Sequence, residues 1–282
     1  MVKPSLAADD VRTAFDAAEV KFLGKGTFGE TWRIDSVQVA GEAIVCAVKF
    51  LDPRTFNAGL VQREIDGLTV VDSRRFARLH EVRDVDVSGV VHTTLVCEYL
   101  PGGDVAWNLT EFGLPSQKDV LAFAVELLHG VKQLHEVDRV HRDLKPANII
   151  LRDGRWDTPV LIDMGLSKGA SDLTMTVYPQ RVGSLIYMAP EQLRGERARK
   201  SSDLWACGII LFTLLTGRHP YVTSFDGKTE DDVAEEITGP PSPLPPHVDA
   251  GLREVILRLL SEDAFERGSA KRALKDLRKA MK

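Results

Sequence analysis

The densest group of chemically capable side chains lies in residues 141–148, which read His-Arg-Asp-Leu-Lys-Pro-Ala-Asn. In this 141–148 loop, Asp143 can orient a hydroxyl group and accept its proton. Lys145 can neutralise a phosphoryl group during transfer. The side-chain oxygen of Asn148, together with Asp163 further along the chain, is typical of a Mg²⁺ site completed by phosphate oxygens. A solvated, charged turn would explain any one of these residues, but not the whole series in this order.

A glycine-rich segment lies near the N-terminus, where residues 24–29 read Gly-Lys-Gly-Thr-Phe-Gly. Glycines at this spacing let backbone N–H groups approach phosphate oxygens closely. A dinucleotide-binding fold would need a helix directly after this segment, whereas residues 30–34 are typical of a strand. The pattern therefore predicts a glycine-rich hairpin rather than a dinucleotide or Walker loop.

A lysine and a glutamate on neighbouring elements complete the candidate phosphate site. Lys49 lies in an apolar strand, where burying its charge is costly unless an anion is near. Glu64 lies near the apolar face of the helix expected over residues 60–71. A pair between Lys49 and Glu64 would hold a polyphosphate beyond the lysine. The alternative is a lysine at a sheet edge that reaches water and a glutamate with no special role.

The elements that must position these residues differ between the two parts of the chain. Up to about residue 99, short runs rich in Val, Ile, Thr and Phe predict antiparallel strands. After residue 103, apolar residues at helical spacing predict long helices, one of them with Ser116 as its N-cap. Strands followed by helices indicate two lobes joined near residues 99–103. The expected strands cover residues 37–39, 44–51, 82–87 and 93–99, and the later helices cover 116–134, 204–215 and 270–281.

The composition excludes several classes of protein. The chain has 282 residues, 44% of them hydrophobic and 27% charged, which is ordinary for a globular protein. The net charge of −5 argues against a nucleic-acid binder. Three scattered cysteines favour reduced, buried thiols, and no apolar run is long enough for a membrane span. We therefore expect a cytoplasmic protein without a membrane anchor. The proline-rich residues 239–246 favour a stiff connector over a motif for a proline-binding partner.

Together these motifs resemble the eukaryotic-like Ser/Thr protein kinases, over residues 19–282. The glycine-rich segment is similar to the loop over the ATP phosphates, Lys49 to the β3 lysine and Glu64 to its helical partner. The 141–148 loop resembles the catalytic loop. Further matches are Asp163-Met164-Gly165 where the family has Asp-Phe-Gly, Ala189-Pro190-Glu191 at the end of the activation segment, Asp203 on a buried helix, and Arg267 as the partner of Glu191.

The resemblance implies an α+β, bilobal protein-kinase-like fold. Its N-lobe would be a small antiparallel β-sheet with one main helix, and its C-lobe would be larger and mostly helical. Residues 1–282 would form a single kinase domain, in which residues 1–14 would be an N-terminal extension. The N-lobe would cover about residues 15–99, the hinge about 98–103 and the C-lobe about 104–282.

The resemblance also implies transfer of the γ-phosphate of Mg-ATP, or Mn-ATP, to Ser or Thr hydroxyls of protein substrates. Asp143 would be the base, Lys145 would neutralise the γ-phosphate and indicate the Ser/Thr class, and Asn148 with Asp163 would hold the metal. Lys49, held by Glu64, would bind the α- and β-phosphates. The expected nucleotide contacts are Leu23, Gly24, Gly26, Gly29, Thr31, Ala47, Lys49, Cys97, Glu98, Leu100, Asp104 and Ile150.

Two alternatives stay open beside an active protein kinase. One is a pseudokinase, a scaffold that binds nucleotide or partners without transfer, and the other is a small-molecule phosphotransferase. For the active kinase we expect autophosphorylation of Thr176, with Thr174 as second choice, and pairing of that phosphate with Arg142. Met164 in place of Phe keeps an apolar side chain of similar bulk. An activating signal could arrive through such phosphorylation or through a regulatory partner of unknown identity.

Overall fold

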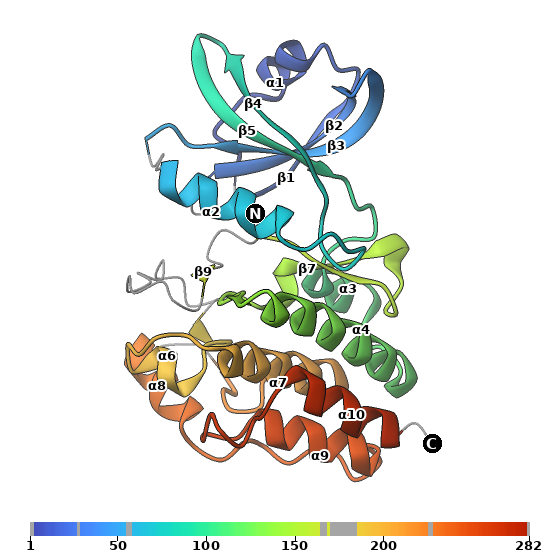
Figure 1. Ribbon diagram of the computed structural model, residues 1–282, viewed down its shortest axis with the longest axis vertical. Coiled ribbons are helices and arrows are strands. Elements are labelled where there is room, and N and C mark those ends of the chain that lie inside the picture. The colour runs from blue at the N-terminus through green and yellow to red at the C-terminus, as the bar shows by residue number, and fades with distance from the viewer. Residues whose placement is uncertain are drawn as a thin grey trace. The chain divides into compact units, whose positions relative to one another are not determined.

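The computed structural model describes residues 3–26, 29–54, 58–163, 168–169, 185–224 and 228–280. The chain divides into two compact units, Met1–Pro101 and Gly102–Lys282 (Figure 1). The division falls within residues 98–103, where the sequence predicts a hinge. The expected α+β class is confirmed, with an antiparallel sheet in the first unit and mostly helices in the second.

The first unit is built on a five-stranded antiparallel sheet with the order β1-β2-β3-β5-β4. The predicted strands at residues 30–34 and 37–39 form one strand, β2, with a register shift between Ile34 and Val37. Ser36 has a φ of 57° at this irregularity, which keeps the strand continuous while it bends. The strands are β1 (Val20–Lys25), β2 (Gly29–Val39), β3 (Glu42–Leu51), β4 (Leu79–Val87) and β5 (Val90–Glu98).

Two helices accompany this sheet. The helix expected over residues 60–71 is α2 (Ala58–Thr69), which contacts β4. A second helix, α1 (Ala8–Phe15), was not foreseen in the sequence. It contacts β1, β2 and β4, and it lies at the top of the unit in Figure 1.

The core of the first unit lies between α1 and one face of the sheet. Because side chains alternate along a strand, Trp32 and Ile34 of β2 share this face with Val48 and Phe50 of β3. Val11 of α1 is completely buried among them. Burial of one apolar face of the sheet under α1 is the main hydrophobic contribution in this unit.

The second unit is a helical layer around α7 (Lys200–Thr216), which is buried along most of its length. The C-cap of α7 is Gly217, whose φ of 69° is the left-handed conformation common at helix C-termini. A side chain at Gly208 would meet Leu259 and Leu260 at 3.0 Å, so glycine permits close packing against α9. The other α-helices described in this unit are α3 (Val105–Phe112), α4 (Gln117–Glu136), α6 (Pro190–Leu193), α8 (Glu230–Ile237), α9 (Ala250–Leu259) and α10 (Ala270–Ala280).

Two other predictions for this unit are confirmed. Ser116 is the N-cap of α4, and its hydroxyl accepts the backbone N–H of Asp119 at 3.2 Å. The proline-rich residues 239–246 connect α8 to α9, with Leu244 buried. Arg253 donates to the carbonyl oxygens of Leu244, Pro245 and Val248, which fixes this connector.

The cysteines only partly match the prediction of buried thiols. None of them forms a disulfide, and Cys46 and Cys207 are buried, whereas Cys97 is half-buried. Burial raises the pKa of the Cys46 thiol to about 11, which keeps it protonated at neutral pH. In the part of the chain that is described, no helix is both long and apolar enough to cross a membrane.

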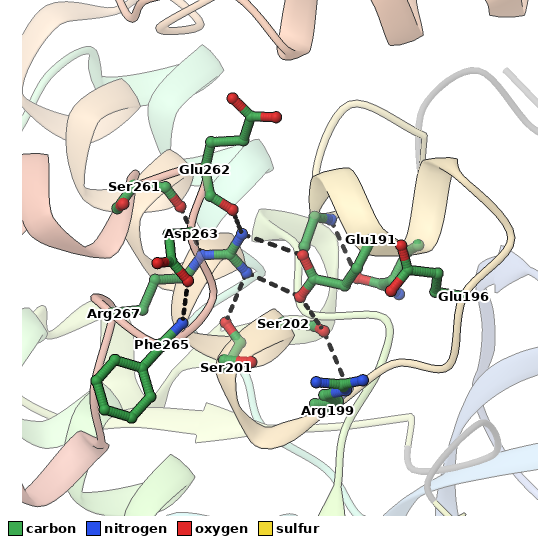
Figure 2. A network of polar contacts seen from close by, with 12 residues as sticks. Glu191, Glu196, Arg199, Ser201, Ser202, Ser261, Glu262, Asp263, Phe265 and Arg267 are labelled. Carbon is green, nitrogen blue, oxygen red and sulfur yellow. Dashed lines mark hydrogen bonds and ion pairs between the residues drawn. The ribbon is translucent and has the colours of Figure 1, made fainter.

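A buried ion pair ties the segment before α7 to the C-terminal helices (Figure 2). Arg267 is 0% exposed, and its guanidinium donates two hydrogen bonds to Glu191, at 2.8 and 3.0 Å. Its other N–H groups reach the carbonyl oxygens of Ser201, Ser261 and Glu262. All five donors of the guanidinium therefore have an acceptor, which is the condition for burying this charge.

The carboxylate of Glu191 also accepts a hydrogen bond from α7. The Ser202 hydroxyl in the first turn of α7 donates to Glu191 at 2.7 Å. Burial alone would raise the pKa of Glu191, but the hydrogen bonds from Arg267 and Ser202 outweigh it, so this pKa lies below its usual value. Arg267 also lies 4.9 Å above the ring of Trp205, which stacks on Tyr221.

We predict that Arg267→Ala lowers the free energy of unfolding by about 3–5 kcal/mol, because it leaves the buried Glu191 carboxylate without its charge partner. Urea denaturation followed by circular dichroism measures the loss. Arg194→Ala is the matched control, since Arg194 pairs with Glu196 at an exposed position and its removal should change stability by less than about 1 kcal/mol. Equal losses in the two variants would contradict the assignment.

Candidate functional site

The 141–148 loop brings three of the predicted residues together. Lys145 Nζ donates to Asp143 Oδ2 at 2.6 Å, and Asn148 Nδ2 donates to the same oxygen at 3.0 Å. Asn148 Nδ2 also donates to the carbonyl oxygen of Asp143 at 2.8 Å. The Asp143 side chain is 16% exposed and that of Lys145 is 21% exposed, so this carboxylate is accessible while it is held on two sides.

Local backbone structure explains this convergence. Pro146 begins the short 3₁₀ helix η1 (Pro146–Asn148), where its fixed φ suits the first position and its missing N–H is not needed. This turn folds Asn148 back toward Asp143. The strand β7 (Ile149–Leu151) follows directly and pairs with β8 (Pro159–Leu161), and η2 (Arg152–Gly154) lies between them.

The pairing of β7 with β8 also places Asp163 beside the loop. The backbone N–H of Ile162 donates to the Asn148 carbonyl at 3.0 Å, so Asp163 follows immediately after a residue bonded to Asn148. Asp163 has a φ of 59°, in the left-handed region, and Arg142 in the loop has a φ of 73°. Such conformations in residues other than glycine are uncommon and are found most often at functional sites.

The carboxylate of Asp203, in the first turn of α7, holds the start of the 141–148 loop through backbone hydrogen bonds. It accepts the backbone N–H groups of His141 and Arg142, each at 2.9 Å, and lies 2.8 Å from Nε2 of His135. Burial alone would raise the pKa of Asp203, but the hydrogen bond from His135 and the charges of both histidines outweigh it, so the pKa is lowered. An ionised Asp203 therefore anchors the two residues that precede Asp143.

In the first unit, the strand register places four predicted residues on one face of the sheet. Lys49 pairs with Thr31 on one side, and Ala47 pairs with Cys97 on the other. Because directly paired residues share a face, these four side chains lie opposite the face that α1 covers. The register therefore places Lys49 on the face of the sheet opposite the apolar cluster under α1.

The glycine-rich segment forms the predicted hairpin between β1 and β2. The N–H of Gly26 donates to the carbonyl of Gly29 at 2.8 Å, and this bond closes the turn. A side chain at Gly29 would lie 1.9 Å from the carbonyl oxygen of Phe50, so no other residue fits at that position. Leu23 lies at the register shift between Phe22 and Gly24 and is 43% exposed.

The remaining predicted nucleotide contacts divide between the two units. In the first unit, the backbone N–H of Glu98 donates to the carbonyl oxygen of Arg78 at 2.8 Å, and the side chain of Leu100 is buried. In the second, Asp104 forms a β-bridge with Ile150. Asp104 is also the N-cap of α3, since its carboxylate accepts the N–H of Trp107 at 2.8 Å. Burial raises the pKa of Asp104.

Several predictions lie outside the described residues. They concern residues 27–28 of the hairpin, the side chain of Glu64, Met164 and Gly165, and the candidate phosphorylation sites Thr174 and Thr176. Among the residues that are described, no three His, Cys, Asp or Glu side chains form a metal-binding group. A metal here would therefore depend on few protein ligands, as Mg²⁺ bound to phosphate does.

Comparison with known proteins agrees with this geometry. A profile of the protein kinase domain matches residues 17–277. The chain belongs to the protein kinase family. It is 30% identical over 81% of its length to "Putative ribosomal protein S6 kinase alpha-1" of Caenorhabditis elegans, and 29% identical over 85% to "Serine/threonine-protein kinase SAPK9" of Oryza sativa subsp. japonica. It is 26% identical over 87% to "Serine/threonine-protein kinases PknA" of Corynebacterium glutamicum. It spans 29%, 65% and 52% of the lengths of these relatives.

Two histidines that support the loops of this kinase were not predicted from the sequence. His135 contacts Asp203, and the only signal for it was a lone histidine at the end of a predicted helix. His219 donates from Nε2 to the carbonyl of Ile186 at 2.9 Å, and its Nδ1 accepts the N–H groups of Tyr221 and Val222 at 3.2 and 3.0 Å. His219 thus fixes the residues that precede the Ala189-Pro190-Glu191 motif.

The same geometry requires a neutral His219, because protonated Nδ1 would face two backbone donors. Burial lowers the pKa of His219 from 6.5 to about 4, against opposing contributions from the Ile186 carbonyl and the charge of Glu236. Since the unfolded chain binds this proton first, the stability from His219 is complete above pH 6.5 and is lost as the pH falls toward 4.

We predict that acidification from pH 7 to pH 4 removes up to about 3 kcal/mol of stability in the kinase through His219 alone. His219→Gln, which keeps a donor and an acceptor but does not titrate, provides the comparison. Unfolding free energies of both proteins should be measured across this range. The stability advantage of the wild type should shrink steadily with falling pH, and two parallel curves would contradict the role of His219.

Proposed function

We propose that this kinase is an active Ser/Thr protein kinase that transfers the γ-phosphate of ATP to hydroxyl groups of proteins. The observation that carries the proposal is the Asp143, Lys145 and Asn148 cluster, which Asp203 holds from the buried first turn of α7. Phosphoryl transfer needs a group that accepts the hydroxyl proton, a positive charge near the phosphate and an oxygen ligand for the metal. Asp143, Lys145 and Asn148 provide groups of these three kinds, and the last two lie within hydrogen-bond distance of Asp143. Two of the relatives reported above carry the words serine/threonine-protein kinase in their names.

In the proposed reaction, Asp143 orients the substrate hydroxyl and accepts its proton. The hydroxyl oxygen forms a bond to the γ-phosphorus as the bond to the bridging oxygen of ADP breaks. Because the transition state is loose, position and charge matter more than the strength of the base. Lys145, at 2.6 Å from Asp143, places a positive charge where the transferred phosphoryl group must pass.

Asn148 and Asp163 are proposed as the metal ligands. Both amide hydrogens of Asn148 are directed to Asp143, so its Oδ1 oxygen is the atom presented to a cation. Asp163 adds a carboxylate next to the residue bonded to Asn148. These oxygens fit Mg²⁺, or Mn²⁺, and the cation would neutralise the phosphate oxygens of ATP.

The first unit would bind the rest of the nucleotide. Lys49 would hold the α- and β-phosphates with Glu64 as its partner, and the backbone of Gly24, Gly26 and Gly29 would cover the phosphates. The adenine and ribose would contact the other residues named for this role: Leu23, Thr31, Ala47, Cys97, Glu98, Leu100, Asp104 and Ile150.

We further propose that the acceptors are Ser and Thr hydroxyls and that the kinase phosphorylates itself. Lys145 beside the base is the feature that implies Ser or Thr as the acceptor. Thr176, or Thr174, would be the internal acceptor, and Arg142 would pair with its phosphate.

We predict that the wild-type chain transfers labelled γ-phosphate from Mg-ATP to itself and to a generic basic protein substrate. Asp143→Asn should reduce the rate about 10²- to 10⁴-fold, because an amide cannot accept the proton. Asp157→Asn is the control, since Asp157 lies in the same unit, its side chain is 46% exposed, and it pairs with the exposed Arg155. Phosphopeptide analysis locates the label.

The outcomes separate the candidates. Label on Ser or Thr residues of protein supports the proposal, and label at Thr176 or Thr174 supports autophosphorylation. Nucleotide binding without transfer by the wild type would favour a scaffold. Equal rates for the wild type and Asp143→Asn would remove Asp143 from the mechanism.

A further inference from the structure

The N-terminal residues 3–16, hereafter the N-terminal clasp, contact the glycine-rich hairpin at an unusual buried carboxylate. Glu30 follows Gly29 directly and is 4% exposed. We infer that the N-terminal clasp positions the glycine-rich hairpin for nucleotide binding, and that Glu30 is the positioning residue. The inference rests on the proposed function, because it assumes that this hairpin binds ATP.

Glu30 is held by three N–H groups. Its Oε2 accepts the backbone N–H of Ser5 at 2.6 Å, and its Oε1 accepts the backbone N–H of Leu6 at 2.9 Å. The indole Nε1 of Trp32 donates to Oε1 at 3.0 Å. A buried carboxylate is costly unless donors surround it, so two of the three groups that allow Glu30 to be buried come from the clasp.

The opposite strand of the hairpin is attached to the same point. Lys25 pairs with Glu30 across β1 and β2, at the last position before the turn. The Lys25 ammonium group donates to the Ser5 hydroxyl. Ser5 therefore contacts both strands where they enter the turn that Gly26 and Gly29 close. A displacement of residues 5–6 would move both sides of the turn.

The other end of the clasp is fixed to the body of the sheet. Val11 is 0% exposed in the apolar core, and Phe15 packs edge-on against Phe50 with ring centroids 5.8 Å apart. The guanidinium of Arg83 lies 5.1 Å above the Phe15 ring. Because α1 is anchored at the centre of the sheet, its N-terminal residues hold the hairpin relative to β3, which carries Lys49.

This attachment has a consequence for affinity. A hairpin whose backbone N–H groups must meet phosphate oxygens loses conformational freedom on binding, unless it is already held in place. The clasp restricts the hairpin from outside the nucleotide site, since Glu30, Ser5 and Leu6 are not among the proposed nucleotide contacts. Its loss should therefore weaken nucleotide binding while it leaves the 141–148 loop unchanged.

Two variants test the inference on the full chain. Glu30→Gln replaces an acceptor oxygen with an NH₂ group that would face a backbone donor. Deletion of residues 2–6 removes the donors of Ser5 and Leu6 but leaves α1 intact and Glu30 open to water, so the fold should survive. Glu19→Gln is the matched control, because Glu19 is an exposed carboxylate that pairs with Arg33 of β2, away from the turn.

The measurements are the dissociation constant for Mg-ADP by calorimetry, and KM for ATP and kcat in the transfer assay. We expect a rise of about three- to tenfold in the dissociation constant and in KM for both variants, up to about 1.4 kcal/mol. The value of kcat should change by less than about twofold, and Glu19→Gln should match the wild type. Amide exchange of residues 24–26 and 29–30 should become faster in both variants.

The possible failures are distinguishable. If the wild type binds nucleotide and both variants bind it equally well with lower thermal stability, the clasp is only structural and the inference is overturned. If kcat falls instead of affinity, the clasp does not act through the hairpin, which also overturns it. A wild type that binds no nucleotide would remove the proposed function together with this inference.

Discussion

The arrangement of the second unit depends on the first turn of α7, where two buried carboxylates are satisfied side by side. Asp203 accepts the backbone of His141 and Arg142, while its neighbour Ser202 donates to Glu191. Neither carboxylate could be buried without these partners. The loop with Asp143 and the motif that ends at Glu191 are therefore fixed to adjacent residues of one helix.

The rest of α7 is buried because its side chains are almost all apolar. The segment from Leu204 to Phe212 lies in the core, with Gly208 packed against α9. Arg267, which follows α9, returns to Glu191 with every donor satisfied. A rigid, apolar helix thus carries polar anchors only at its N-terminal turn, where they hold the residues proposed for catalysis.

The first unit uses a different principle. Its sheet buries one face under α1 and leaves the other for Lys49, Ala47, Thr31 and Cys97. The alternation of side chains along the strands creates this division. Glu30 then connects the residues that precede α1 to the glycine-rich hairpin. Through this connection, the packing of α1 on the sheet can affect the position of the hairpin.

Much of this was predictable because it depends on local patterns. Ser116 and the apolar spacing of α4 and α10 indicate these two helices directly, and a continuous apolar run indicates α7. The cluster around Asp143 was also predictable, since short spacing and Pro146 force those side chains together. These features need little information from distant parts of the chain.

The features that were missed are long-range. Nothing near Glu30 indicates that residues 5–6 will supply its donors, and nothing near His219 indicates a bond to Ile186. The helix α1 lacks an N-cap side chain that could have revealed it, and it is stabilised by packing on the sheet. The half-burial of Cys97 likewise follows from its sheet face, not from its neighbours in sequence.

The most direct test of this account is Asp203→Asn, measured by amide exchange and by phosphoryl transfer in the same preparation. An amide in place of the carboxylate presents a donor to backbone N–H groups, so the amides of His141 and Arg142 should exchange faster. We expect kcat to fall about 10- to 100-fold, since a displacement near 1 Å can have this effect, while nucleotide affinity stays within about twofold. Asp138→Asn, at an exposed carboxylate paired with Lys200, should match the wild type. Unchanged exchange and unchanged kcat in Asp203→Asn would contradict the claim that α7 holds the loop.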